Sequence, residues 1–361
     1  MKLDYRTISR RSRNPSARGS MESRLLRRPA RLLLVAVLSF FLAGASPAPG
    51  IALATKSGDR STTVCFVARN HPDRERAMRV PSHAVPKILR TSLSYLGPCA
   101  EYGHPISLGD GALRTYTQRV RSRPLAMGVT FPASTLRNLP VPVSDGKHCF
   151  DKDGDGELDL HKECAVGHEH VLDLPRGFRK AIDTPFEWSL TNWNPEGHMP
   201  SGVYSVPHFD FHFYIQPLAE RNQIRPGPCP ILTNCDDYAR AKLPVPERYR
   251  APDFTDVDAV EPAMGNHLID LTSPEFHGRP FTHTWIYGQY DGEITFYEAM
   301  ITKAWFNGQR ASKTRDICVP FKQPREWQRS GWYPTNYCIA FRENRDDYTV
   351  ALTNFRYQKA S

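Results

Sequence analysis

The chain has 361 residues and a formal net charge of +9, but this charge is concentrated in its first 54 residues. Residues 1–54 contain 10 basic and two acidic residues, which leaves 37 basic against 36 acidic residues in the remainder. Nothing in this nearly neutral remainder indicates the basic surface by which proteins bind nucleic acids or anionic membranes, so we expect neither partner.

Residues 1–54 have the layout of a secretory signal peptide. Four arginines between residues 24 and 31 precede an apolar run of 12 residues at 32–43, and Ala52-Leu53-Ala54 supplies small residues for cleavage. The apolar run is too short to span a bilayer. We therefore expect a protein that is secreted or resides in the periplasm or cell envelope, with no membrane span after cleavage. Whether translation starts at Met1 or Met21 stays open.

All eight cysteines follow this leader. An even number of cysteines in an exported chain indicates disulfide bonds, and these cysteines fall into four couples that follow one another along the chain. We therefore predict the pairs Cys65–Cys99, Cys149–Cys164, Cys229–Cys235 and Cys318–Cys338. A thiolate zinc site is disfavoured because closely spaced Cys-x-x-Cys pairs are absent from the sequence.

Residues 55–105 are predicted to form a small unit of their own. Residues 64–68 and 78–80 have the composition of strands, and residues 82–89 that of a short helix. With its flanking cysteines, this stretch resembles a small Cys-rich module of exported bacterial proteins. We interpret it as an accessory unit held by a disulfide bond.

Residues 106–357 are predicted to form a β-rich domain. Short alternating runs lie at residues 114–117, 125–131, 185–190, 285–290, 294–299 and 348–352. Residues 290–293 (Tyr-Asp-Gly-Glu) indicate a hairpin turn between two of these runs. Because prolines are frequent and long amphipathic helices are scarce, the expected fold is mainly β: an antiparallel β-sandwich or barrel with a few short helices.

An inserted loop at residues 149–164 resembles part of a calcium-binding loop. Its carboxylates stand at the spacing of calcium ligands and comprise Asp151, Asp153, Asp155, Glu157 and Asp159. Position 12 of the pattern is Lys162, where a bidentate glutamate is usual, and Glu163 follows one place late. We therefore expect a structural calcium ion. The alternative is a solvated acidic turn held by Cys149–Cys164.

The most distinctive stretch is residues 207–214, which read Pro-His-Phe-Asp-Phe-His-Phe-Tyr. Side chains alternate between the two faces of a strand, so His208, Asp210 and His212 share one face and the phenylalanines share the other. The aromatic face suits a hydrophobic core. Three buried groups of metal-ligand type require a bound ion or polar partners, because their burial without one is costly.

Further groups of this kind lie in apolar or Gly/Pro-rich segments elsewhere. The predicted ligand set is His198, His208, His212, His267 and Glu298, with Asp210 orienting an imidazole. Such a set suits zinc, iron, copper or manganese. Glu196 or Asp270 is a candidate proton acceptor.

The spacing along the strand limits this prediction. Residues four apart in a strand are separated by about 13 Å at Cα, so His208 and His212 can share one ion only at full stretch or across a bulge. We therefore expect residues 207–214 to be the strand on which His198, His267 and Glu298 converge. The alternative is a buried histidine–carboxylate network without an ion.

Four segments together, residues 194–198, 207–214, 264–267 and 286–292, resemble an uncharacterised family of exported bacterial proteins. The family is defined only as a domain of unknown function and has a member from Thermus. The likeness covers residues 106–357, and it implies a β-rich fold and homo-oligomers but no activity.

We expect an exported metal-binding β-domain protein, with a metal-dependent enzyme of unknown substrate as one form of this hypothesis. The second hypothesis is a non-enzymatic binding or structural protein of the cell envelope. A third is a carrier that binds a small apolar or carbohydrate ligand in a cavity walled by Phe, Tyr and Trp side chains.

Overall fold

The computed structural model describes residues 60–312 and 316–361. The predicted signal peptide of residues 1–54 lies outside the described residues. Within the described part of the chain, no helix has the length and apolar character needed to cross a membrane.

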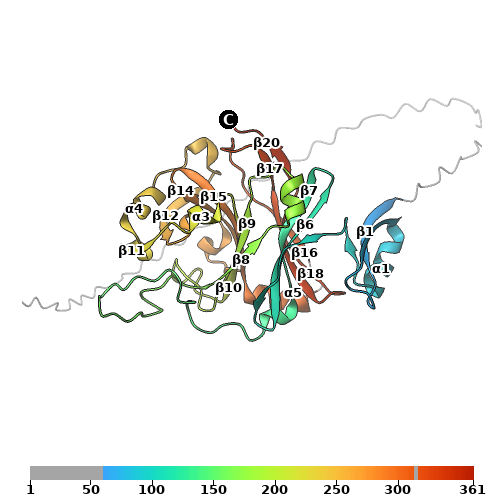
Figure 1. Cartoon of the computed structure of the whole chain (residues 1–361), viewed down its shortest axis with the longest axis horizontal. Coiled ribbons are helices and arrows are strands. Elements are labelled where there is room, and N and C mark those ends of the chain that lie inside the picture. Colours follow the sequence, from blue (N-terminus) through green and yellow to red (C-terminus); the bar gives the residue numbers. More distant parts are fainter. Residues whose placement is uncertain (1–59, 313–315) are drawn as a thin grey trace, which may run out of the picture. The chain divides into compact units, whose positions relative to one another are not determined.

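Two seven-stranded antiparallel sheets form most of the structure (Figure 1). The first sheet, called the β10 sheet below, has the order β12-β13-β14-β15-β10-β9-β8. Its strands are β8 (His168–Asp173), β9 (Trp188–Asn194), β10 (His208–Tyr214), β12 (Phe254–Glu261), β13 (Gly265–Asp270), β14 (His283–Tyr290) and β15 (Glu293–Thr302).

The second sheet has the order β16-β18-β19-β7-β6-β4, and β5 pairs with β6 beside this path. Its strands are β4 (Glu101–Tyr102), β5 (Ile106–Leu108), β6 (Gly111–Val120), β7 (Arg123–Pro132), β16 (Asp316–Pro320), β18 (Asn336–Arg342) and β19 (Asp347–Thr353). The predicted antiparallel, mainly β fold is therefore confirmed.

The remaining elements are short. The α-helices are α1 (Val85–Thr91), α2 (Arg176–Ala181), α3 (Leu218–Arg221), α4 (Cys235–Ala241) and α5 (Lys303–Ala311). The 3-10 helices are η1 (Ser82–Ala84), η2 (Ala133–Leu136), η3 (Pro230–Leu232), η4 (Glu247–Tyr249) and η5 (Pro274–His277). Outside the large sheets, β17 (Gly331–Tyr333) pairs with β20 (Arg356–Gln358), and β11 (Pro226–Cys229) makes isolated bridges.

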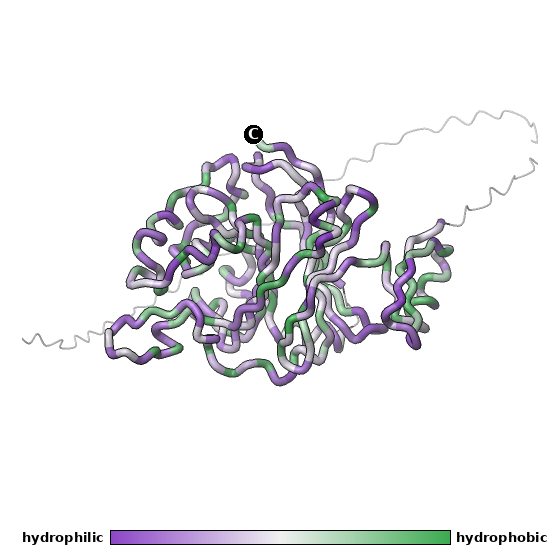
Figure 2. The backbone as a smooth tube through the Cα atoms, viewed as in Figure 1, coloured by the Kyte–Doolittle hydropathy of each residue, from purple (hydrophilic) through white to green (hydrophobic). Residues whose placement is uncertain are grey.

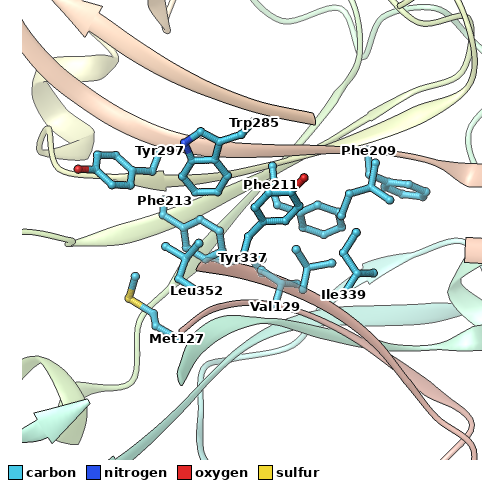
Figure 3. Packing of buried hydrophobic residues seen from close by; sticks show 14 of the residues in the cluster. Met127, Val129, Phe209, Phe211, Phe213, Trp285, Tyr297, Tyr337, Ile339 and Leu352 are labelled. Carbon is cyan, nitrogen blue, oxygen red and sulfur yellow. The ribbon is translucent and has the colours of Figure 1, made fainter. Parts of the chain in front are cut away.

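The hydrophobic core lies between the two large sheets, and the phenylalanines of β10 are at its centre. Phe209, Phe211 and Phe213 are fully buried, and Phe211 stacks on Phe131 of β7 at 6.1 Å between ring centroids. Figure 3 shows these rings facing Val129 and other residues of the opposite sheet. The predicted aromatic face of residues 207–214 is therefore confirmed.

Hydrophobic and hydrophilic residues mix along the strands of both sheets (Figure 2).

The predicted hairpin joins β14 to β15 through Asp291 and Gly292, which have φ of 55° and 76°. Two central residues with positive φ characterise a type I′ turn, whose twist matches that of paired strands.

At the N-terminal end of the described chain, β1 (Ser61–Val67) pairs with β2 (Glu75–Pro81) and β3 (Tyr95–Leu96) in a small sheet of its own. Asn344 Nδ2 donates hydrogen bonds to the Ser92 and Ser94 carbonyls, and these bonds attach the small sheet to the large domain. The predicted domain boundary at residue 105 stays a prediction.

All eight cysteines form disulfide bonds in the predicted pairs, Cys65–Cys99, Cys149–Cys164, Cys229–Cys235 and Cys318–Cys338. This outcome excludes a thiolate zinc site, because the described residues contain no free cysteine.

Candidate metal centre

The outer face of the β10 sheet, which is the face turned away from the sandwich core, carries a strip of polar side chains. Strand pairing places Asn194 beside His208, and Glu298 beside His212. Two apolar clusters flank this strip: Trp188, Leu190, Tyr214, Met264 and Phe296 on one side, and Tyr204, Ile269, Phe281, Ile286 and Met300 on the other. The polar side chains of this strip are buried, among them His208, His212 and Glu298.

The loop at residues 195–207, between β9 and β10, brings His198 back over the strand that follows it. The His198 backbone N–H donates to the Tyr204 carbonyl at 3.3 Å, and Val206 N–H donates to the same oxygen at 2.8 Å. Gly197 has φ of 75°, and a Cβ at this position would lie 2.0 Å from the Tyr204 oxygen. Only glycine allows this close approach.

His198, His208 and Asp210 form the first triad. Asp210 lies between the two imidazoles, with Oδ2 at 3.3 Å from His198 Nε2 and Oδ1 at 3.2 Å from His208 Nε2. An ion with tetrahedral bonds of about 2.0–2.2 Å separates its ligand atoms by roughly 3.3–3.6 Å. Both nitrogen–oxygen distances are close to this separation, although each runs to a different oxygen of Asp210.

Both imidazoles of the first triad are oriented by backbone carbonyl groups. His198 Nδ1 donates to the Met199 carbonyl and His208 Nδ1 donates to the Val206 carbonyl, each at 2.7 Å. A carbonyl only accepts hydrogen bonds, so Nδ1 carries the proton in each ring and a neutral ring presents the Nε2 lone pair to Asp210. Two lone pairs facing one carboxylate require a cation, either a metal ion or added protons, to make the contact favourable.

Without a metal ion, protons on the imidazole Nε2 atoms would make the contact with Asp210 favourable. Burial lowers the pKa of His198, but the hydrogen bond and charge of Asp210 outweigh burial and raise it to about 9. Burial raises the pKa of Asp210, but the two histidines outweigh it and hold the pKa well below its ordinary value. The ion-free triad is therefore a charged network, the alternative considered from the sequence.

Two asparagines of β9 complete the surroundings of Asp210 and were missed in the sequence. Asn194 Nδ2 donates to Asp210 Oδ2 at 2.6 Å and fixes the carboxylate. Asn192 pairs with Asp210 in the strand register, and its buried Oδ1 has no hydrogen-bond partner among the described residues. The signal was the presence of two asparagines two residues apart in a strand, where asparagine is usually depleted.

His212, His267 and Glu298 form the second triad. His212 Nε2 lies 3.5 Å from Glu298 Oε1, and His267 Nδ1 donates to the Ala259 carbonyl at 2.9 Å. Burial lowers the pKa of His212 to about 3. Burial, together with the charges of Asp210 and Glu261, raises the pKa of Glu298 well above its ordinary value.

The structure therefore brings the five predicted ligands together in two groups instead of at one place. Strand β10 supplies one histidine to each group, and the other ligands come from the loop before β10, from β13 and from β15. In each group one ligand atom per residue lies within 4.8 Å of the others. Asp210 contacts both imidazoles of the first triad directly, so its position is that of a third ligand as well as that of an orienting group. The number of ions and the role of each residue stay predictions.

The two candidate proton acceptors lie in different settings. Glu196 is 60% exposed and lies 3.9 Å from His161 of the aspartate-rich loop. Asp270 forms an ion pair with Lys322 at 2.6 Å. Glu196 is therefore the more accessible of the two to a proton from solvent.

The aspartate-rich loop gathers three of its five predicted calcium ligands. Carboxylate oxygens of Asp151, Asp153 and Asp155 lie within 4.8 Å of one another. Asp159 instead pairs with Lys162 at 2.8 Å. The carboxylate of Glu163 accepts backbone N–H groups of residues 152, 153 and 159, so it holds the loop from inside. Glu157 is exposed and lies outside the converging group.

Searches against protein-family models, curated proteins and solved structures find no match for the chain. The resemblance of residues 106–357 to an exported family with a Thermus member therefore stays a prediction.

Proposed function

We propose that the protein is an exported metalloprotein whose first triad holds a divalent transition-metal ion with one coordination position open for chemistry. The observation that carries this proposal is the orientation of two Nε2 lone pairs, fixed by backbone carbonyls, toward the single carboxylate of Asp210. Metal-binding histidines commonly donate their second ring N–H to such a partner.

The donor set indicates the chemistry. Two histidines and one carboxylate bind zinc in hydrolytic enzymes and iron(II) in oxygenases, and both kinds of site keep a position open. The His198 side chain is 17% exposed, whereas the His208 side chain is completely buried. The accessible side of an ion would therefore face the loop at residues 195–207. A bound divalent ion lowers the pKa of a coordinated water or polarises a substrate oxygen.

The direct test is metal analysis of the protein purified without added metal, followed by zinc titration of chelator-treated protein. We expect the His208→Gln variant to lose one ion per chain relative to wild type. His277→Gln is the matched control, because its ring is exposed and donates to the Leu271 carbonyl away from the triad. Wild type that neither contains nor takes up zinc, iron, copper or manganese would contradict the proposal and favour the charged network.

The open position has its own test. In protein loaded with cobalt(II), we expect azide to shift the visible absorption bands, because an exchangeable ligand position accepts the anion. A spectrum that azide leaves unchanged would indicate a closed structural ion and would exclude metal-dependent catalysis at the first triad.

Export and assembly belong to the same proposal. Four disulfide bonds support an oxidising compartment outside the cytoplasm. The aspartate-rich loop is proposed to hold a structural calcium ion. Homo-oligomers and a small-molecule ligand stay predictions, and sedimentation of the purified protein tests the first of these.

A further inference from the structure

We propose that the second triad, His212, His267 and Glu298, binds a second divalent transition-metal ion in a closed structural site separate from the first. This inference goes beyond the proposed function, because it assigns a second ion with a different role. It rests on the geometry of three strands and does not depend on an ion in the first triad.

Strand register brings the three side chains to one place. Glu298 of β15 is paired directly with His212 of β10, and His267 comes from β13, on the far side of β14. Gly288 of β14 pairs with His267 on one side and with Phe296 on the other, and a Cβ at this glycine would lie 2.1 Å from the Phe296 ring. The missing side chain therefore leaves room for Phe296 and for His267 to reach across β14.

Buried polar atoms without partners mark this place as a ligand site. Neither ring nitrogen of His212 has a hydrogen-bond partner within the described chain, and the same holds for Glu298 Oε2. The two side chains are 1% and 2% exposed. A buried polar atom left unpaired loses its hydration without compensation. Three such atoms at the junction of three strands would be unfavourable, and an ion would satisfy most of them.

The orientation of His267 supports the same conclusion. Its Nδ1 donates to the carbonyl of Ala259, which follows the bulge in β12, so a neutral ring presents its Nε2 lone pair to the triad. A β-bulge redirects backbone and side-chain groups locally, and here it provides the acceptor that orients this ring.

The surroundings distinguish this site from the first. The Phe296 ring packs edge-on against His212 at 4.9 Å and against His267 at 5.2 Å between centroids. Tyr214 stacks on the adjacent Trp188 at 4.0 Å. These aromatic rings exclude water, so an ion here would exchange slowly and would stabilise the sheet instead of reacting with a substrate.

The two triads are too far apart on β10 for one ion to serve both. The Cα atoms of His208 and His212 are separated by about 13 Å in an extended strand. We therefore expect two zinc ions per chain, and loss of the second triad should leave the first ion in place.

The test is native mass spectrometry of the full-length mature protein titrated with zinc. We expect wild type to reach two ions per chain, and Glu298→Gln and His208→Gln to reach one each. After brief exposure to a chelator, wild type should retain one ion and His208→Gln should retain its single ion, whereas Glu298→Gln should lose its single ion. Circular dichroism checks that both variants fold, and His267→Gln serves as a second variant that removes a ligand from a different strand, β13.

Each failure has a distinct signature. Wild type that saturates at one ion, lost in His208→Gln but kept in Glu298→Gln, overturns the second site and leaves the proposed function intact. One ion that is kept in His208→Gln but lost in Glu298→Gln overturns the proposed function and supports the second site. Wild type that binds no ion overturns both proposals, and this result needs no variant. If wild type binds one ion and Glu298→Gln does not fold, the His267→Gln variant decides whether that ion lies in the second triad.

Discussion

Gly197 is the residue at which a single methyl group should disturb the first triad most selectively. In Gly197→Ala, the new Cβ would lie 2.0 Å from the Tyr204 oxygen and 2.5 Å from Val206 N. Real Cβ contacts essentially never fall below 3.0 Å, so the loop must open by at least 1.0 Å. The Val206 carbonyl orients His208 and the substituted residue adjoins His198, so the movement displaces both imidazoles.

Gly202 in the same loop provides the matched control. It also has positive φ, 80°, but a Cβ there would meet no atom within 4 Å. Both alanine variants therefore carry the cost of a left-handed residue, about 1–2 kcal/mol. Only Gly197→Ala adds the steric conflict.

We expect Gly197→Ala to weaken zinc binding at the first triad by about 10–100-fold, as when a group that orients a ligand is lost. Gly202→Ala should bind zinc as wild type does. Competition with a chromogenic chelator measures the affinity, and urea unfolding in a chelator separates this effect from stability. Equal zinc affinity of the two variants would refute the proposed role of the loop.

Three further predictions concern the sheet and the loops. Burial raises the pKa of Glu169, but the His148 hydrogen bond and the Arg221 charge outweigh it and lower the pKa to about 2. This carboxylate should therefore contribute up to about 3 kcal/mol above pH 4.5 and lose it as pH falls toward 2. Urea unfolding against pH should show this loss, and Glu169→Gln should flatten the curve; an unchanged curve would contradict the assignment. Calcium should raise the melting temperature of wild type but not of Asp153→Ala, and equal insensitivity of both proteins would exclude a calcium ion in the loop. Phe211→Ala, in the centre of the core, should destabilise the protein by about 3–5 kcal/mol in urea, whereas a loss below 1 kcal/mol would show that the core repacks.

The part of the site that could be predicted from the sequence was the separation of polar and aromatic side chains onto opposite faces of β10. Alternation of polar and aromatic residues at 208–213 identified both the core face and the ligand face before the partners of the strand were known. The disulfide pairs were also predictable, because each cysteine is bonded to the next or the preceding cysteine along the chain. Both inferences depend on short distances along the chain.

The division into two triads could not be predicted, because it depends on the register of strands that are distant in sequence. Nothing near Gly288 indicates that this glycine pairs with both His267 and Phe296, and the bulge that places the Ala259 carbonyl is a tertiary feature. Strand β12 itself was missed because its aspartates are unusual in strands. Its acidic side chains are instead partly neutralised by Lys242.

The loop at residues 195–207 also has a consequence for the order of assembly. His198 and Asp210 are separated by 12 residues, so the first triad needs only a hairpin to form, with a small loss of chain entropy. The second triad joins residues 212, 267 and 298 and needs three strands in register. In a chain that folds after export, an ion could therefore enter the first triad while the sheet is still incomplete, whereas the second triad would form only in the finished sheet. The first ion would then be present while the chain folds, and the second ion would bind and stabilise only the completed sheet.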